Sequence, residues 1–528
     1  MKIPRHIWIP LAVLWIAVMA IEGEVIRRTG RVIYPLDDPY IHLAMARHFA
    51  ADAVFGVSLD GFSATSSSPG WTLLLGVLFL IFGSHAFVPL MLNLLAASLL
   101  LVWISRTVFC QTQNSALALG FSIFFLFALP LPTMVCTGME HPLHIGLVLL
   151  LVTAALRGMD RPTVGKEDAS LFALAAAAAM IRYETLFLVA PLAVLSVASG
   201  RWKRAVILLL GAGLPLGLIG ILNRYEGWYF FPNSILLKSA LNMPRGDWVM
   251  AILIRFKNQL TETAHLWTLI LLGSLRMVSL LSRPITTETR EWRWGFAFLF
   301  TAMLHGALAL TGWFYRYEGY LLALGMVALV GAIPACLSAC RCAWHGGDRA
   351  GERILARGGM VALLLLALIP FWNNFISFRD VLPGVENVFQ QQYQMGRFLR
   401  AYYNGETVAA NDIGAINYLA DLHCMDLVGL GSVEPIKASK QRLFNEGFVE
   451  SWARLRDAKI AVIYENWWRH VIPATWTKVG EWTVPRKATA GDATVAFFAV
   501  TAGEVERLRE SLHAFQPQLP PQVIVKWF

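Results

Sequence analysis

The chain has 528 residues, of which 56% are hydrophobic and only 15% are charged, and its formal net charge is +9. A soluble protein of this length needs about twice that charged fraction on its surface, so the composition excludes a soluble globular protein. Apolar runs recur at the length that a bilayer requires, which indicates a polytopic membrane protein. The Lys and Arg residues lie mostly in loops, where they set topology and lipid contact and do not imply nucleic-acid binding.

The apolar runs predict membrane spans in the part of the chain that ends at residue 375. The predicted spans are residues 7–23, 86–105, 115–132, 140–156, 168–181, 185–199, 204–222, 265–281, 294–311, 318–338 and 358–375. With these eleven crossings the N-terminus and nearly all basic loops fall on one side, as the positive-inside rule requires. The short run 71–83 would reverse the later loops if it crossed, so we predict a juxtamembrane helix there. Arg27, Arg28 and Arg31, in the first outer loop, do not fit this pattern.

Residues 376–528 differ in composition from the membrane part and fall on the outer side. Strand patterns cover 406–411, 424–430, 459–464 and 494–500, and helix patterns cover 413–420, with Asp412 as its N-cap, and 503–514. We therefore predict a membrane domain over 1–375 and an external α/β domain over 376–528.

Two adjacent carboxylates, Asp37 and Asp38, lie just after the first span. Apolar residues recur at helical spacing over 41–49, so a helix begins here, with Pro39 in its first turn. Asp38 is then the N-cap, which accounts for it without catalysis, although a catalytic share stays open. Asp37 lies one residue before the cap and has no evident structural role. It is our candidate general base.

Candidate phosphate ligands lie at the outer ends of the predicted spans. The tripeptide Arg-Tyr-Glu occurs at 182–184, 224–226 and 316–318, where it could simply anchor the helices at the interface. Alternatively, Arg182 or Arg316 binds a lipid-linked phosphate, since the guanidinium fork matches phosphate oxygens. Lys238 is a further candidate, and its alternative is snorkelling from a surface helix.

Other polar residues near these cations are candidates for sugar or acceptor binding. Glu140 opens a span, where it could complement the helix dipole or accept from sugar hydroxyls. We place His42, His141, Glu184 and Asn233 in the same group. The metal question is left open: a divalent cation is allowed, no cofactor is assigned, and the cysteines at 336, 340 and 342 indicate packing more than metal binding.

Nucleotide-binding, metalloprotease and serine-hydrolase motifs do not occur in the chain. An enzymatic function therefore depends on carboxylates and cations at one face of a membrane. Such a set suits transfer from an activated lipid phosphate, because a carboxylate takes the acceptor's proton while cations stabilise the departing phosphate.

An ordered set of motifs resembles the GT-C glycosyltransferases. The motifs are Asp37-Asp38-Pro-Tyr-Ile, Ser66-Ser-Ser-Pro69-Gly-Trp71-Thr, Thr137-Gly-Met-Glu140, Pro232-Asn233 and Asn411-Asp412-Ile-Gly414-Ala. They run through most of the membrane part and into the start of the external domain. Within the superfamily the chain is most similar to bacterial families around the mycobacterial terminal arabinofuranosyltransferases.

The resemblance implies a polyprenyl-phosphate sugar donor, an inverting transfer and an external active site, with Asp37 at the position of the base. The chain departs from the family at 182–184, where Arg-Tyr-Glu replaces the frequent Arg-Pro followed by an acid, and this leaves the donor sugar open.

We therefore expect a glycosyltransferase of the bacterial inner membrane, with its active site and C-terminal domain on the periplasmic side. Its partners are a polyprenyl-phosphate sugar, a glycan or glycolipid acceptor and membrane lipids. One alternative is a transporter or flippase of a lipid-linked sugar, although such proteins bind near the bilayer midplane. Another is a non-catalytic glycan-binding subunit, which would show no turnover.

Overall fold

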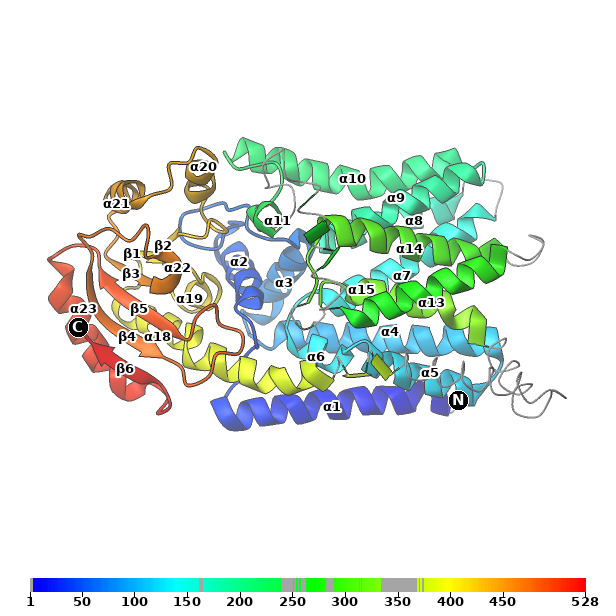
Figure 1. Ribbon diagram of the computed structural model, residues 1–528, viewed down its shortest axis with the longest axis horizontal. Helices are drawn as coiled ribbons and strands as arrows, with labels where there is room; N and C mark the ends of the chain where they lie inside the picture. The colour runs from blue at the N-terminus through cyan, green and yellow to red at the C-terminus, as the bar shows by residue number, and fades with distance from the viewer. Residues whose placement is uncertain are drawn as a thin grey trace.

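The computed structural model describes residues 3–160, 165–238, 250, 253–254, 256–257, 263–281, 289–312, 314, 316–333, 368–369, 371–372 and 375–528. It contains a bundle of long helices and, at one end of this bundle, a mixed α/β domain (Figure 1). The bundle and the C-terminal domain are those expected from the composition.

Four helices of the described residues are long and apolar enough to cross a membrane: α1 (Arg5–Thr29), α4 (Val88–Thr112), α7 (His141–Met159) and α10 (Trp202–Tyr225). The bundle also contains α5 (Ser115–Ala128), α8 (Lys166–Ile181), α9 (Thr185–Ala198), α13 (Ala264–Leu281), α14 (Thr289–Leu308) and α15 (Gly319–Leu329). The chain is thus an integral membrane protein. Each predicted span up to 318–338 overlaps one of these helices, whereas 358–375 lies mostly outside the described residues. The number of crossings therefore stays a prediction.

The predicted span 115–132 is too long. Helix α5 ends at Ala128, Leu129 is extended, and the short helix α6 (Leu131–Cys136) follows. The cause is Pro130, because a proline ring disfavours the helical conformation of the residue before it.

Helices α2 (Asp38–Asp52) and α3 (Pro69–Phe82) lie at the end of the bundle that faces the C-terminal domain (Figure 1). At the usual helical rise, α3 is about 21 Å long, less than the hydrocarbon core of a bilayer. This position agrees with a juxtamembrane helix at 71–83, and whether α3 crosses the membrane stays a prediction.

Two of the three arginines that did not fit the charge pattern make contacts outside the bundle. Arg27 and Arg28 both bind Glu24, and Arg28 also binds Glu386 at 2.5 Å. Arg31 donates to the hydroxyl of Tyr393 and lies over its ring. Arg28 and Arg31 therefore hold the end of α1 to the helical segment 375–402, which leads into the C-terminal domain.

The C-terminal domain contains a six-stranded sheet with the order β2-β1-β3-β5-β4-β6. Strands β1 (Thr407–Ala410), β2 (His423–Asp426) and β3 (Ile460–Ile463) are parallel, and β4 (Thr477–Thr483), β5 (Thr494–Ala499) and β6 (Ile524–Trp527) extend the sheet in antiparallel pairs. The helices are α18 (Gln392–Tyr402), α19 (Gly414–Leu419), α20 (Glu434–Lys440), α21 (Glu446–Leu455), α22 (Glu465–Trp468) and α23 (Glu504–Phe515). Strands β4 and β6 were not predicted from the sequence.

The predicted strand 424–430 ends early, at Asp426. The Asp426 carboxylate accepts hydrogen bonds from the amides of Val428 at 2.9 Å and Gly431 at 2.7 Å. The chain therefore curls around this side chain and cannot continue the sheet.

Helix α2 lies between two hydrophobic cores. Tyr40 and Leu43 belong to the core of the helical bundle, whereas Ile41 and Met45 pack in the core of the C-terminal domain. The apolar face predicted over 41–49 thus includes residues that cover the domain. Because α2 is buried from both sides, the carboxylates at its start have defined positions.

Candidate active site

A cavity of about 230 Å³ opens beside the start of α2. Its wall combines charged and hydroxyl groups with a larger apolar surface, a combination common in small-molecule sites. The polar lining residues are Asp38, Ser67, Arg182, Tyr183, Glu184, Ser234, Arg316 and Tyr317, and the apolar ones are Met139, Leu186, Phe187, Phe231, Ile235, Leu308, Ala309 and Leu310.

Asp38 and Arg316 form an ion pair in the wall of this cavity. Nη2 of Arg316 donates to Oδ2 of Asp38 at 2.6 Å. The Arg316 side chain is 3% exposed, and its Nε and Nη1 atoms have no hydrogen-bond partner among the described residues. Because a buried donor without a partner is costly, these two atoms indicate a site for an acceptor other than the groups of the described residues.

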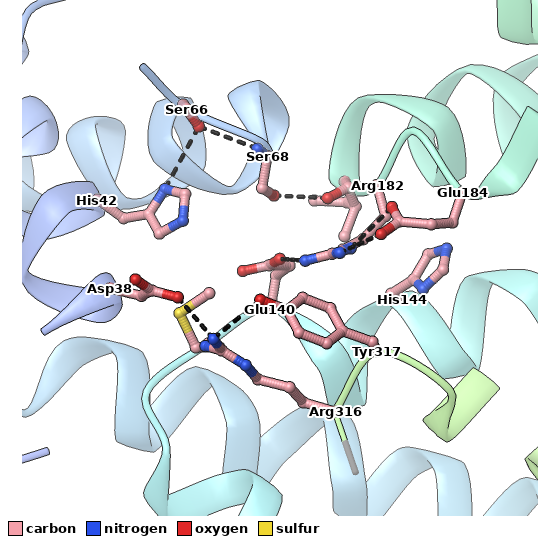
Figure 2. Close-up of polar contacts among 12 residues, drawn as sticks. Asp38, His42, Ser66, Ser68, Glu140, His144, Arg182, Glu184, Arg316 and Tyr317 are labelled. Atoms are coloured by element: carbon pink, nitrogen blue, oxygen red, sulfur yellow. Dashed lines mark hydrogen bonds and ion pairs between the residues drawn. The ribbon is translucent and has the colours of Figure 1, made fainter. Parts of the chain in front are cut away.

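Arg182 is bound by two carboxylates. Its Nη1 donates to Glu140 at 2.7 Å, and its Nε donates to Glu184 at 3.0 Å (Figure 2). Glu140 is completely buried, and its second oxygen has no partner among the described residues. The arginine therefore neutralises buried charge beside the cavity, and Glu140 itself is not among the residues that line it.

Tyr317 links the two arginines. The guanidinium carbon of Arg182 lies 5.6 Å from the centre of its ring, and that of Arg316 lies 4.9 Å from it. Sequence analysis did not single out Tyr317, although it is the central residue of the third Arg-Tyr-Glu tripeptide. The repeated tripeptide was the signal that could have identified it.

The two candidate histidines differ in their surroundings. His42 is 2.8 Å from Oγ1 of Thr72 and 3.3 Å from Oγ of Ser66, through its Nδ1 atom. His141 is 2% exposed and meets the ring of Tyr317 edge to face. His42 thus belongs to a buried hydroxyl network near Asp38 (Figure 2), and His141 packs against the Tyr317 ring that both arginines contact.

Asp37 points to the C-terminal domain. Its two carboxylate oxygens accept from the amides of Gly414 at 2.7 Å and Ala415 at 2.8 Å, at the start of α19. A Cβ atom on Gly414 would lie 2.2 Å from the backbone oxygen of Asp37, so only glycine fits there. Burial, together with the nearby carboxylate of Asp412, raises the pKa of Asp37 to about 8. Asp37 thus has the structural role that the sequence did not reveal.

The two predicted caps are wrong. Asp412 does not cap the helix predicted over 413–420, because its carboxylate accepts from Gln392 at 2.9 Å and from Tyr464. The Asp37 carboxylate, which lies before α2, instead accepts from the amides at the start of α19. Asp38 is not the N-cap of α2 either, since it is the first residue of that helix.

Asn233 also holds the C-terminal domain. Its side-chain amide donates to the backbone oxygens of Gly429 at 2.7 Å and Ser432 at 3.3 Å. Helix α11 (Asn233–Lys238) begins here, and the side chain of Lys238 lies outside the described residues. Asn233 is therefore not among the residues that line the cavity, whereas its neighbour Ser234, which the sequence did not single out, is.

In the described ranges, no group of three or more His, Cys, Asp or Glu side chains comes together as a metal site. The cysteines at 336, 340 and 342 lie outside those ranges. Whether the protein needs a divalent cation is therefore an open question, as it was from the sequence.

Comparison with known proteins gives one family match over part of the chain and several solved structures that are similar to it. Residues 386–498 match the family described as "Domain of unknown function (DUF8728)". No curated protein matches the chain.

ArnT from Cupriavidus metallidurans bound to undecaprenyl phosphate has a similar structure, with a TM-score of 0.52 and 14% identity over 94% of this chain and 98% of ArnT. The apo state of ArnT gives a TM-score of 0.51 and 13% identity over the same shares. The Archaeoglobus fulgidus oligosaccharyltransferase, in complex with zinc and sulfate, aligns at a TM-score of 0.47 and 12% identity over 98% of this chain and 74% of that one, which is too weak to carry an argument. At these identities the likeness to ArnT shows the fold alone: this membrane protein has a GT-C-like fold, and the narrower resemblance to arabinofuranosyltransferases stays an interpretation.

Proposed function

We propose that the protein is an inverting glycosyltransferase that moves a sugar from a polyprenyl phosphate to a hydroxyl group of a glycan or glycolipid outside the cytoplasm. One observation carries the proposal. A carboxylate, Asp38, and a guanidinium with unused donors, Arg316, share the wall of a cavity that is otherwise mainly apolar. The fold supports it, because ArnT, which has a similar structure, is seen with undecaprenyl phosphate bound.

Asp38 is the general base in this proposal, in place of Asp37. The Asp38 side chain is 30% exposed and lines the cavity, so an acceptor hydroxyl can reach it. Asp37 is not among the cavity residues, and both of its oxygens are hydrogen bonded to the backbone of the C-terminal domain. A base must lie within hydrogen-bond reach of the proton that it takes, and the place of Asp38 in the cavity wall supports this role.

Arg316 would bind the phosphate of the donor. As the acceptor oxygen forms its bond to the anomeric carbon, the bond from that carbon to the phosphate oxygen breaks, and its electron pair remains on the phosphate. The acceptor's proton passes to the Asp38 carboxylate. Nη2 of Arg316 holds Asp38, while Nε and Nη1 are free among the described residues to meet the growing negative charge.

The remaining wall suits the rest of the donor. Phe231, Leu308 and Leu310 offer an apolar surface for the first isoprene units. The Glu184 carboxylate, which lines the cavity next to Arg182, can accept a hydrogen bond from a sugar hydroxyl. A single displacement with one base inverts the anomeric configuration, because the acceptor attacks opposite the departing phosphate.

The transporter alternative is less well supported. The site lies at the end of the bundle where α2 and the C-terminal domain meet (Figure 1), whereas transporters bind their substrates near the middle of the membrane. The test is to incubate the purified protein with a panel of polyprenyl-phosphate sugars and simple alcohols. We expect release of polyprenyl phosphate together with an alkyl glycoside of inverted configuration. Movement of labelled donor across vesicles without any release would support the transporter instead.

A further inference from the structure

A second, much smaller pocket adjoins the cavity. Its volume is about 20 Å³, and it shares Asp38, Ser67, Met139 and Ser234 with the wall of the larger cavity. The residues that line only the small pocket are Ile41, His42, Thr65, Ser66 and Leu430. Asp38 thus lies where a donor in the large cavity and a second reactant in the small pocket would meet.

The small pocket contains an unsatisfied hydroxyl group. Ser234 is 6% exposed, and its Oγ atom has no hydrogen-bond partner among the described residues. A pocket of this volume holds about one oxygen atom of the size of water, since roughly 10–15 Å³ is enough for one. The pocket therefore fits a single hydroxyl group that would hydrogen bond to Ser234 and Asp38.

Leu430 is the residue of the C-terminal domain that lines this pocket among the described residues. It lies in the loop 427–432, which is rigidly built. The Asp426 carboxylate holds the amides of Val428 and Gly431, and Asn233 holds the carbonyl groups of Gly429 and Ser432. Gly429 has a φ of 93°, a conformation that other residues rarely adopt. The loop therefore places Leu430 against the small pocket by contacts on both sides.

We propose that the small pocket receives the attacking hydroxyl of the acceptor and that Leu430 is a specificity-determining residue, which limits the size of the group that carries this hydroxyl. The inference rests on the proposed function. It gives the C-terminal domain a direct part in acceptor choice, because the domain supplies one wall of the pocket beside the base.

The experiment uses two alcohols as probes of the full-length protein. Glycerol offers primary hydroxyl groups, whereas myo-inositol offers only secondary hydroxyl groups on a ring. Wild type should favour glycerol. Leu430→Ala should raise the ratio of inositol to glycerol product by about tenfold or more, the usual effect of changing the fit of a pocket by a few carbon atoms. Leu430→Ala should still release polyprenyl phosphate, so that the ratio of the two products can be measured. Leu455→Ala is the matched control, because Leu455 belongs to the same domain and is 84% exposed.

A second variant fills the pocket reversibly. In a background with Cys110→Ser, Cys336→Ser, Cys340→Ser and Cys342→Ser, which leaves only the buried Cys136 and Cys424, Leu430→Cys is treated with a methanethiosulfonate reagent whose group is bulkier than the leucine side chain. Modification should abolish transfer to both alcohols and leave donor binding unchanged, and dithiothreitol should restore transfer.

An unchanged product ratio in Leu430→Ala, with normal release of polyprenyl phosphate, would overturn the inference and leave the proposed function standing. Undiminished transfer after modification of Leu430→Cys would do the same. If the wild type releases no polyprenyl phosphate with any donor, the proposed function fails, and the inference that rests on it falls too.

Discussion

Asp37 and Asp38 are neighbours in the chain, but they face two different regions of the molecule. Asp37 lies at the interface between the bundle and the C-terminal domain, where the amides of Gly414 and Ala415 bind both of its oxygens. Asp38 lies in the wall of the cavity, bound to Arg316. The difference teaches that two adjacent acids can have different surroundings: one carboxylate binds the C-terminal domain, and the next lines the cavity.

The largest effect should come from Asp38→Asn. Asparagine keeps the shape of the side chain and can still accept from Arg316, but it cannot take a proton. We expect turnover to fall by about 10²–10⁴-fold, the usual contribution of a general base. The measurement is polyprenyl phosphate release by the purified variant.

Asp37→Asn is the matched control for this comparison, and it should retain most of the turnover. Loss of activity in Asp37→Asn, with activity retained in Asp38→Asn, would reverse the roles of the two acids.

Next in size is the effect of Arg182→Ala on stability. The substitution leaves two carboxylates, Glu140 and Glu184, without their buried cation, and breaking such a pair costs about 3–5 kcal/mol. We expect a clearly lower midpoint of thermal unfolding in detergent. Arg224→Ala is the control from another Arg-Tyr-Glu copy, because Arg224 is exposed. Equal midpoints for the two variants would show that the arginine cluster contributes little to stability.

Arg316→Ala should weaken donor binding by about 1.5–3 kcal/mol, the range for hydrogen bonds to charged groups. Arg316→Lys should restore only part of the affinity, because lysine keeps the charge but loses the planar fork. The measurement is the affinity for the polyprenyl-phosphate donor, with Arg224→Ala again as the control. Wild-type affinity in Arg316→Ala would place the phosphate site elsewhere.

The last prediction concerns the pH dependence of stability. Burial and Asp412 raise the pKa of Asp37 to about 8, from an ordinary value of 3.8. Between these values the folded protein holds a proton that the unfolded chain releases, so the free energy of unfolding should fall as the pH rises through this window. Asp37→Asn removes the titrating group and should make this part of the stability curve flatter. Identical pH profiles for wild type and variant would contradict the raised pKa.

Much of the architecture could be predicted because it depends on local patterns. Long apolar runs located the helices of the bundle, and short continuous apolar runs located β1, β3 and β5, since both signals lie within a few neighbouring residues. The strands β4 and β6 were missed. The pattern did not mark β6 at the edge of the sheet, where its side chains are partly exposed. The break of the helix after Ala128 was missed as well, although Pro130 is a signal that the sequence carries.

The sequence by itself determined that this is a membrane protein with a C-terminal α/β domain. It also identified the acids at 37 and 38 and the Arg-Tyr-Glu copies at 182–184 and 316–318 as candidate site residues, because composition and spacing are local properties. Only the tertiary structure decided what each of these residues does. Asp37 binds an amide 377 residues away in the chain, and Arg316 binds Asp38 across 278 residues. These contacts depend on how the bundle and the domain pack on the two sides of α2. The periodicity of the sequence does not indicate which distant residues come together.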